Sequence, residues 1–208
     1  MTRRLRNAWL VLISAAAVLS LSGCGYNDMA QGEENIKAAW AEVTNQYQRR
    51  ADLIPNLVNT VKGFAEQEKE VLTRVVEARA KATQITVTPE MLDDPQAMQR
   101  FAAAQRELGS ALSRLLAVAE NYPQLKSDAV FRDLTAQLEG TENRIAVARN
   151  RYIKAIQAYN NTVVSFPTNI TAMIFGFKKK EQFQVEDEAA IKKAPTVDFS
   201  KPAAPAKP

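Results

Sequence analysis

With 208 residues, 46% apolar and 24% charged, the chain has room for one ordinary domain, or at most two, and can bury a real core. It contains no histidine and one cysteine, Cys24, which excludes Ser-His and Cys-His nucleophiles, zinc sites of the usual Cys/His kind and an internal disulfide framework. The net charge of +4 does not indicate a nucleic-acid partner, because three of the 27 basic residues lie in a segment that we expect to be removed and the others nearly balance the 23 acidic residues.

Residues 1–23 have the zones of a bacterial export signal. A basic start is followed by an apolar run over 8–21, about 14 residues long and so shorter than the ~20 that a membrane-spanning helix needs. The run ends in Leu-Ser-Gly-Cys24, which resembles the bacterial lipoprotein box, where the cysteine thiol is acylated and becomes the first residue after cleavage. We therefore predict a signal peptide over 1–23, lipid chains such as palmitate on Cys24, and a non-cytoplasmic position in the cell envelope. An uncleaved membrane anchor is the alternative, and the choice between inner and outer membrane stays open.

One long apolar stripe follows. From Ile36 to Ala82, stripe residues recur in alternating steps of four and three, a period of 3.5 that is typical of a continuous helical seam. The register persists across Pro55, which predicts a single helix over about 33–83. Pro55 should kink this helix, because proline cannot donate the hydrogen bond to the carbonyl of Ala51.

Further helices are expected downstream. Asp94 precedes a proline and predicts the start of a second long helix, which ends before Pro123. A third long stripe begins near Asp128. A short fourth helix is expected over about 168–175, with Thr168 as its cap. No strand-like alternation competes with these stripes.

The stripes predict an all-α fold, because each needs a partner that covers its apolar face. We expect an antiparallel bundle of three long helices plus a short C-terminal helix, with an unusually long, kinked first helix. The bundle should occupy 33–177, after a tether over 24–32 and before a C-terminal extension over 178–208, which is rich in proline, alanine and lysine and is predicted to be disordered from about 195. Three glycines beside the stripes predict close backbone approach between helices: Gly63, Gly109 and Gly140.

Four blocks of the sequence resemble the LemA family. They run from Arg49 to Ala65, from Leu116 to Pro123, from Thr141 to Asn160 and from Phe166 to Phe177, and the resemblance covers about 26–199. It implies a membrane-attached, all-helical bundle on the envelope side, with no established catalytic activity and a scaffold or quality-control role. The chain departs from the family pattern at Gln67, where many members have histidine.

Polar residues within the helices are predicted to form a structural hydrogen-bond network. The alternative is a carboxylate metal site like that of di-iron bundles, but those sites need Glu-x-x-His pairs and the chain has no histidine. We therefore expect no metal and no other cofactor. The network should comprise Arg50, Glu68, Glu120, Asn121, Glu142, Asn143 and Arg149.

An apolar segment ending in Phe175-Gly-Phe177 meets a basic run that begins with Lys178 and Lys179. These four side chains are candidates for binding a partner protein or for lying against anionic lipid. The alternative is that the aromatic rings close the end of the bundle while the lysines remain in water.

The leading interpretation is a lipid-anchored helical scaffold of the bacterial envelope, attached to the membrane through Cys24 and bound to an unidentified envelope protein. No catalytic activity and no small-molecule substrate are predicted. A second interpretation is a membrane-surface organiser that binds lipid through the aromatic-lysine segment. A less favoured third is a metal-dependent envelope hydrolase that uses buried carboxylates.

Overall fold

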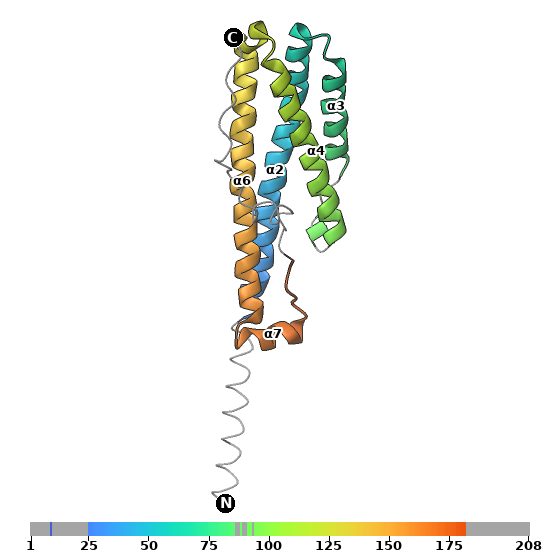
Figure 1. The fold of residues 1–208 in the computed structure, drawn as a ribbon. Coiled ribbons are helices and arrows are strands. Elements are labelled where there is room, and N and C mark those ends of the chain that lie inside the picture. Colours follow the sequence, from blue (N-terminus) through green and yellow to red (C-terminus); the bar gives the residue numbers. More distant parts are fainter. Residues whose placement is uncertain (1–8, 10–24, 86–87, 89–90, 93, 182–208) are drawn as a thin grey trace, which may run out of the picture.

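The computed structural model describes residues 9, 25–85, 88, 91–92 and 94–181. Apart from residue 9, the predicted signal peptide lies outside the described residues, as do the predicted lipidation site and the predicted disorder near the C-terminus. Within the described ranges the chain forms one elongated helical bundle without strands (Figure 1). The predicted all-α antiparallel bundle is confirmed.

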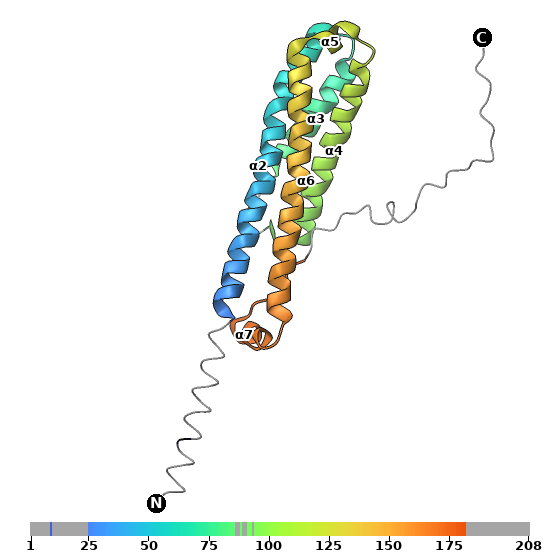
Figure 2. The ribbon, with the colours of Figure 1, turned by 90° about the vertical axis from the view of Figure 1, so that its left-hand side faces the viewer.

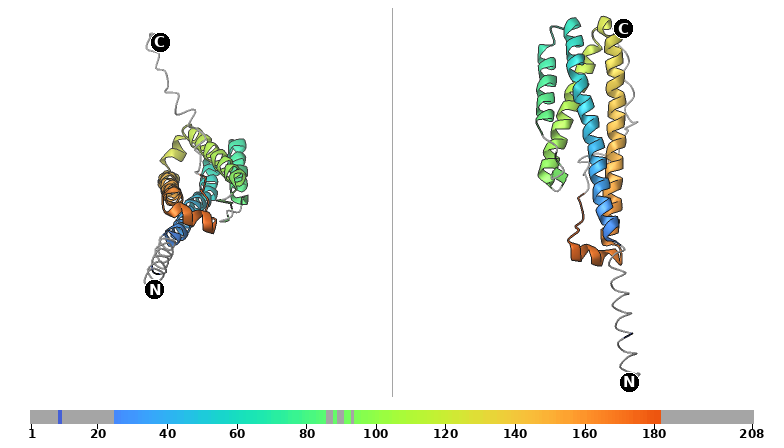
Figure 3. Two further views of the ribbon diagram at one scale, coloured as in Figure 1. Left: turned by 90° about the horizontal axis from the view of Figure 1, so that it is seen from below. Right: turned by 180° about the vertical axis from the view of Figure 1, so that it is seen from behind.

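From residue 25 to residue 181, the described parts of the chain form three long helices and three shorter ones: α2 (Tyr26–Phe64), α3 (Lys69–Gln84), α4 (Pro95–Ala119), α5 (Pro123–Ser127), α6 (Ala129–Val164) and α7 (Thr168–Phe175). The longest two, α2 and α6, run antiparallel side by side along the whole bundle (Figure 2). α3 packs beside the second half of α2, and α4 packs on α3 with its first turns reaching Trp40 of α2. α7 lies across the end where α2 begins and α6 ends (Figure 3).

The first helix is shorter than predicted, and the single helix over 33–83 is wrong. α2 ends at Phe64, and the chain reverses through a tight turn in which the Glu68 N–H donates to the Ala65 carbonyl oxygen at 3.1 Å. A continuous helix would leave the stripe of α3 in water, whereas the reversal buries it in a core shared with α2 and α4. The predicted stripe of alternating steps includes Val71 as a buried position, but after the turn it is the neighbouring Leu72 that is buried.

Pro55 lies inside α2 and does not end it. The carbonyl of Ala51, which has no helical donor because Pro55 lacks an N–H, accepts a hydrogen bond of 2.8 Å from Nε of Arg79 on α3. Because of the proline, a backbone carbonyl of α2 is available to accept a hydrogen bond from α3, and this bond connects the two helices.

The predicted tether over 24–32 is wrong from Tyr26 onward, because α2 begins there. Met29 is fully buried, and Gly32 faces the ring of Tyr159 on α6. A Cβ atom on Gly32 would come within 3.0 Å of Tyr159 Cδ2. The glycine that we interpreted as the end of a tether is a site of close contact between α2 and α6.

The predicted cap at Asp94 is confirmed, and Asp128, near which the third long helix was expected to begin, is also a cap. The Asp94 side chain accepts hydrogen bonds from two backbone N–H groups of α4, and Asp128 accepts one from α6. The predicted cap at Thr168 is wrong: Pro167 holds the cap position of α7, and the hydroxyl of Thr168 donates to the Ser165 carbonyl, three residues earlier, at 2.8 Å.

The close approach predicted at Gly63, Gly109 and Gly140 is also wrong. A Cβ atom at Gly63 or Gly109 would meet nothing within 4 Å, and one at Gly140 would meet only the guanidinium of Arg144, at 3.6 Å. These glycines face outward from the seams.

The core divides into two clusters along the bundle. One joins the second half of α2 to α3, α4, α5 and the start of α6. The other joins the first half of α2 to the second half of α6 and to the start of α4, and reaches α7 and Phe177. Arg50 lies on α2 between Tyr47 of the second cluster and Ile54 of the first.

Candidate functional site

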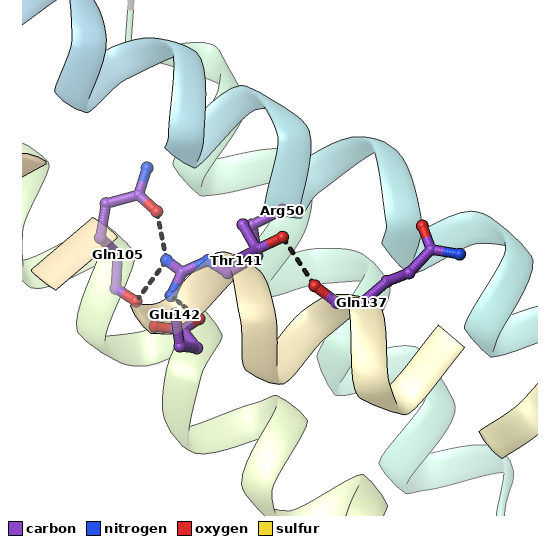
Figure 4. A network of polar contacts seen from close by, with 5 residues as sticks. All are labelled: Arg50, Gln105, Gln137, Thr141 and Glu142. Atoms are coloured by element: carbon purple, nitrogen blue, oxygen red, sulfur yellow. Dashed lines mark hydrogen bonds and ion pairs between the residues drawn. The ribbon is translucent and has the colours of Figure 1, made fainter. Parts of the chain in front are cut away.

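A buried arginine joins three helices at the boundary between the core clusters (Figure 4). The side chain of Arg50, from α2, is only 4% exposed. Its Nη1 lies 2.6 Å from Oε1 of Glu142 on α6. Its Nη2 donates to Gln105 of α4, at 2.5 Å to the side-chain oxygen and 3.2 Å to the backbone carbonyl. Neighbouring Thr141 donates instead to the Gln137 carbonyl on its own helix, at 2.7 Å.

The surroundings of Arg50 are partly apolar. The centre of the Tyr47 ring lies 5.1 Å from its guanidinium carbon, and no atom in the described ranges accepts a hydrogen bond from its Nε. Burial raises the pKa of Tyr47, although the charges of Arg149 and Arg50 act in the opposite direction. Because Glu142 is half exposed, this charge pair runs from the core to the surface. Such an arrangement is suited to holding three helices in register.

The residues predicted to form one polar network lie in two separate parts of the bundle and on its surface. Glu142 pairs with Arg50, and Arg149 hydrogen-bonds to Tyr47. Both therefore belong to the group of side chains around Arg50, which we call the buried centre. Glu68 accepts a hydrogen bond of 3.0 Å from the Tyr122 hydroxyl at the opposite end from α7. The three remaining predicted members, Glu120, Asn121 and Asn143, are exposed on the surface. Glu120 pairs there with Lys126.

Gln105 and Tyr47 contribute to the buried centre, and sequence reasoning treated both only as stripe positions. The signal for Gln105 was present: a glutamine on the apolar seam of one helix, in a bundle whose neighbouring seam carries an arginine. Buried polar side chains need hydrogen-bond partners, and Gln105 and Arg50 are partners of each other.

The four predicted partner-binding residues all lie at the α7 end but in different settings. Phe175 is exposed, whereas Phe177 is partly buried against the core. Their ring centres lie 5.0 Å and 5.5 Å from that of Tyr26, both edge to face. Lys178 and Lys179 are exposed. The structure thus places one aromatic ring on the surface and the other in the end of the bundle.

The segment after α7 turns back along α6. Gly176 adopts a left-handed conformation, φ +79°, and the next N–H, that of Phe177, donates to the Ala172 carbonyl at 2.9 Å. Further on, Asn160 of α6 exchanges two hydrogen bonds with the backbone of Lys180, at 2.8 Å and 2.9 Å.

An open groove of about 360 Å³ lies between α3 and α4. Its lining includes the apolar Val71 and Ala111, and also Arg74, which pairs with Glu70 at 2.5 Å. No group of three or more carboxylates or cysteines in the described parts of the chain is placed to hold a metal ion. Among the helices that the structure describes, none is long and apolar enough to span a membrane.

Comparison with known proteins identifies the relatives of this chain. The family model "LemA family" matches residues 39–199. Magnetosome protein MamQ of Magnetospirillum gryphiswaldense is 26% identical over 203 residues, which cover 87% of this chain and 75% of that protein. Magnetosome protein MamQ 1 of Paramagnetospirillum magneticum is 26% identical over 83% of this chain and 70% of that protein. Protein LemA of Metamycoplasma hominis is 19% identical over 77% of this chain and 69% of that protein. The resemblance found in the sequence is confirmed, and the chain belongs to the LemA family.

Proposed function

We propose that this protein is a lipid-anchored, non-catalytic scaffold of the bacterial cell envelope, which holds its far end away from the membrane for binding to another envelope protein. The observation that carries the proposal is the start of α2 at Tyr26, two residues after Cys24. With so short a connection, an acyl anchor on Cys24 is attached almost directly to a 39-residue helix, which at ~1.5 Å per residue is about 58 Å long.

The shape of the bundle supports a role as a spacer. α2 and α6 run the full length and share an apolar seam that contains Ile36, Val43, Ile145 and Ile156. The buried Arg50 fixes the register of both helices against α4. A rod held in this way keeps a constant distance between its two ends.

The comparisons support the proposal in a general way. The names of the relatives denote no reaction, and those of the MamQ proteins place them in the magnetosome. In this chain the buried polar groups around Arg50 pair with one another across three helices. That arrangement supports stability and register rather than turnover of a substrate.

The test is acyl labelling of cells that produce the full chain. The native protein should incorporate labelled palmitate, and Cys24→Ala should lose the label and keep residues 1–23. A matched control combines Cys24→Ala with Val130→Cys, which moves the only thiol to an exposed site on α6 and should also remain unlabelled. Equal labelling and equal size of the native protein and Cys24→Ala would refute the anchor.

A second function, organisation of the membrane surface, is supported by one specific observation. The short helix α7 exposes a set of large apolar side chains next to the exposed Lys178 and Lys179. This combination is typical of protein segments that bind lipid surfaces.

A further inference from the structure

The short helix α7 turns its more hydrophobic face outward. Thr171 and Ala172 face the bundle and are buried. Ile170, Met173 and Ile174, at spacings of three and four, share the opposite face and are 46%, 78% and 65% exposed. A helix that packs on a water-exposed protein surface normally has the reverse arrangement.

Two exposed phenylalanines flank this face in the sequence. Phe166, just before α7, is 79% exposed, and Phe175, at its end, is 56% exposed. No charged residue occurs from Phe166 through Phe177, and the next two residues are Lys178 and Lys179. We call five of these exposed side chains the α7 patch: Phe166, Ile170, Met173, Ile174 and Phe175. Contiguous exposed apolar side chains of this kind mark contact surfaces for protein or membrane.

The position of the α7 patch indicates which contact it makes. Gly25, the residue before α2, packs against α7 so closely that a Cβ atom there would lie 2.6 Å from Cγ2 of Thr168. Consecutive Cα atoms are about 3.8 Å apart, so Cys24 is joined to the chain at α7. The residues upstream include the apolar run 8–21 and the lipoprotein-box cysteine, whose natural environment is a bilayer.

We propose that the α7 patch lies in the interfacial layer of an anionic membrane, with Lys178 and Lys179 beside the lipid phosphates. The chain then touches the bilayer at two places, through the segment that ends at Cys24 and through α7. Two contacts restrict tilting of the rod, so α2 and α6 project from the membrane. The proposal builds on membrane attachment upstream of Gly25, and it holds for an acylated cysteine and for an uncleaved anchor alike.

The experiment measures the contact between α7 and lipid in the full chain. The protein is extracted from cell membranes, reconstituted into vesicles of phosphatidylethanolamine and phosphatidylglycerol (7:3) and recovered by flotation. A fluorescent amino acid replaces Met173 in one variant and Val130 in the other. Both positions are exposed and apolar, at 78% and 57%, but they lie at opposite ends of the bundle. Lipids with a spin label near the headgroup should quench the reporter at 173 at least about threefold more strongly than the reporter at 130.

Equal quenching at the two positions overturns the proposal, as does a reporter at 173 that is shielded from water but not quenched by lipid. The latter result would show that protein covers the patch, either a second copy of this chain or its own N-terminal segment. Vesicles of phosphatidylcholine alone test the charge contribution. Quenching at 173 should fall in them, and unchanged quenching would overturn the role given to Lys178 and Lys179.

A charge-insertion pair provides a second readout. Met173→Asp with Ile174→Asp, in the chain with the reporter at 130, should raise lipid quenching at 130, because a rod with a single attachment can tilt towards the bilayer. Val147→Asp, at a 49% exposed site midway along α6, should not. All three exposed positions should tolerate charge with little change in melting temperature. If quenching at 130 stays low in the double variant, α7 does not orient the bundle. Because cysteine labelling is independent of these results, failure here is distinguishable from failure of the lipid anchor.

Discussion

Arg79 on α3 donates a hydrogen bond of 2.8 Å to the carbonyl oxygen of Ala51 on α2, which has no helical partner because Pro55 lacks an N–H. A defect in one helix is thereby repaired by a side chain of the next. The contact spans 28 residues of sequence and forms only if the chain reverses at residues 65–68. It therefore connects the local effect of the proline with the antiparallel position of α3.

This relationship predicts coupling between Arg79 and Pro55. Arg79→Ala should lower the free energy of unfolding by about 1 kcal/mol, the usual net value of one hydrogen bond. In a Pro55→Ala background the helix supplies its own donor to Ala51, so the same substitution should cost less, with a coupling energy of about 0.5 kcal/mol or more. Urea denaturation of the four proteins measures the cycle.

Arg74→Ala is the matched control for this cycle. Arg74 lies on the same helix but, among the residues that the structure describes, its ion pair is with Glu70, four residues earlier on the surface. Its removal should change stability by less than about 0.5 kcal/mol, with or without Pro55. Coupling of Pro55 to Arg74 as strong as that to Arg79 would contradict the proposed role of the Ala51 carbonyl.

Sequence reasoning located the helices well and the reversal poorly. The stripes marked α4 and α6, with Asp94 and Asp128 near their starts, and the short helix expected over about 168–175 is α7. The turn between α2 and α3 has no proline and keeps near-heptad spacing, because Val61, Ala65, Leu72 and Val75 are all buried. A short reversal and a continuous helix give nearly the same pattern, and only the need of α3 for a tertiary partner distinguishes them.

The charge pair at the buried centre gives a second prediction. Glu142→Ala leaves the guanidinium of Arg50 buried without its carboxylate, which should cost about 1–3 kcal/mol, less than a fully buried pair because Glu142 is half exposed. Arg50→Met combined with Glu142→Ala should recover much of the loss, because an apolar side chain of similar length needs no partner. Chemical denaturation measures both variants, and a double variant less stable than Glu142→Ala alone would contradict this account.

The tyrosines predict a loss of stability at high pH. Burial raises the pKa of Tyr47, and the hydrogen bond to Glu68 raises that of Tyr122. The folded state therefore keeps both protons at pH values where the unfolded chain loses them, so stability is full below about pH 10 and falls as the pH rises above it. Tyr47→Phe and Tyr122→Phe should each make this fall less steep. Unfolding free energies across about pH 9–12 test the slopes, and identical slopes in all three proteins would refute the assignment.

A matched pair of glycine substitutions tests whether residues 26–32 form a packed helix or a tether. Gly32→Leu should destabilise the protein by about 1–3 kcal/mol, because its Cβ atom would meet Tyr159 at 3.0 Å. Gly63→Leu introduces the same side chain where a Cβ atom meets nothing within 4 Å, and should be neutral or stabilising by up to about 1 kcal/mol. Thermal unfolding compares them, and no loss of stability in Gly32→Leu would favour a tether.

The sequence predicted which residues belong to the candidate sites better than it predicted how those residues are arranged in space. The sequence pointed to Arg50 and Glu142 as buried polar residues and to the aromatic-lysine segment as a surface. It did not distinguish Phe175 from Phe177, because the turn at Gly176 sends one ring outward and the other against the core. Nor did it show that α7 meets the start of α2, since that contact between Gly25 and Thr168 depends on the antiparallel path of the whole bundle.

The central claim is that the bundle stands on the membrane at its α7 end and holds its other end away from it. Neutron reflectometry on a supported anionic bilayer containing the full chain measures the thickness of the protein layer directly. Because α2 has 39 residues at ~1.5 Å each, an upright bundle predicts a layer about 55–65 Å thick. A layer of about 20–25 Å, the thickness of two stacked helices each ~10 Å across, would mean that the bundle lies flat on the bilayer and would contradict the claim.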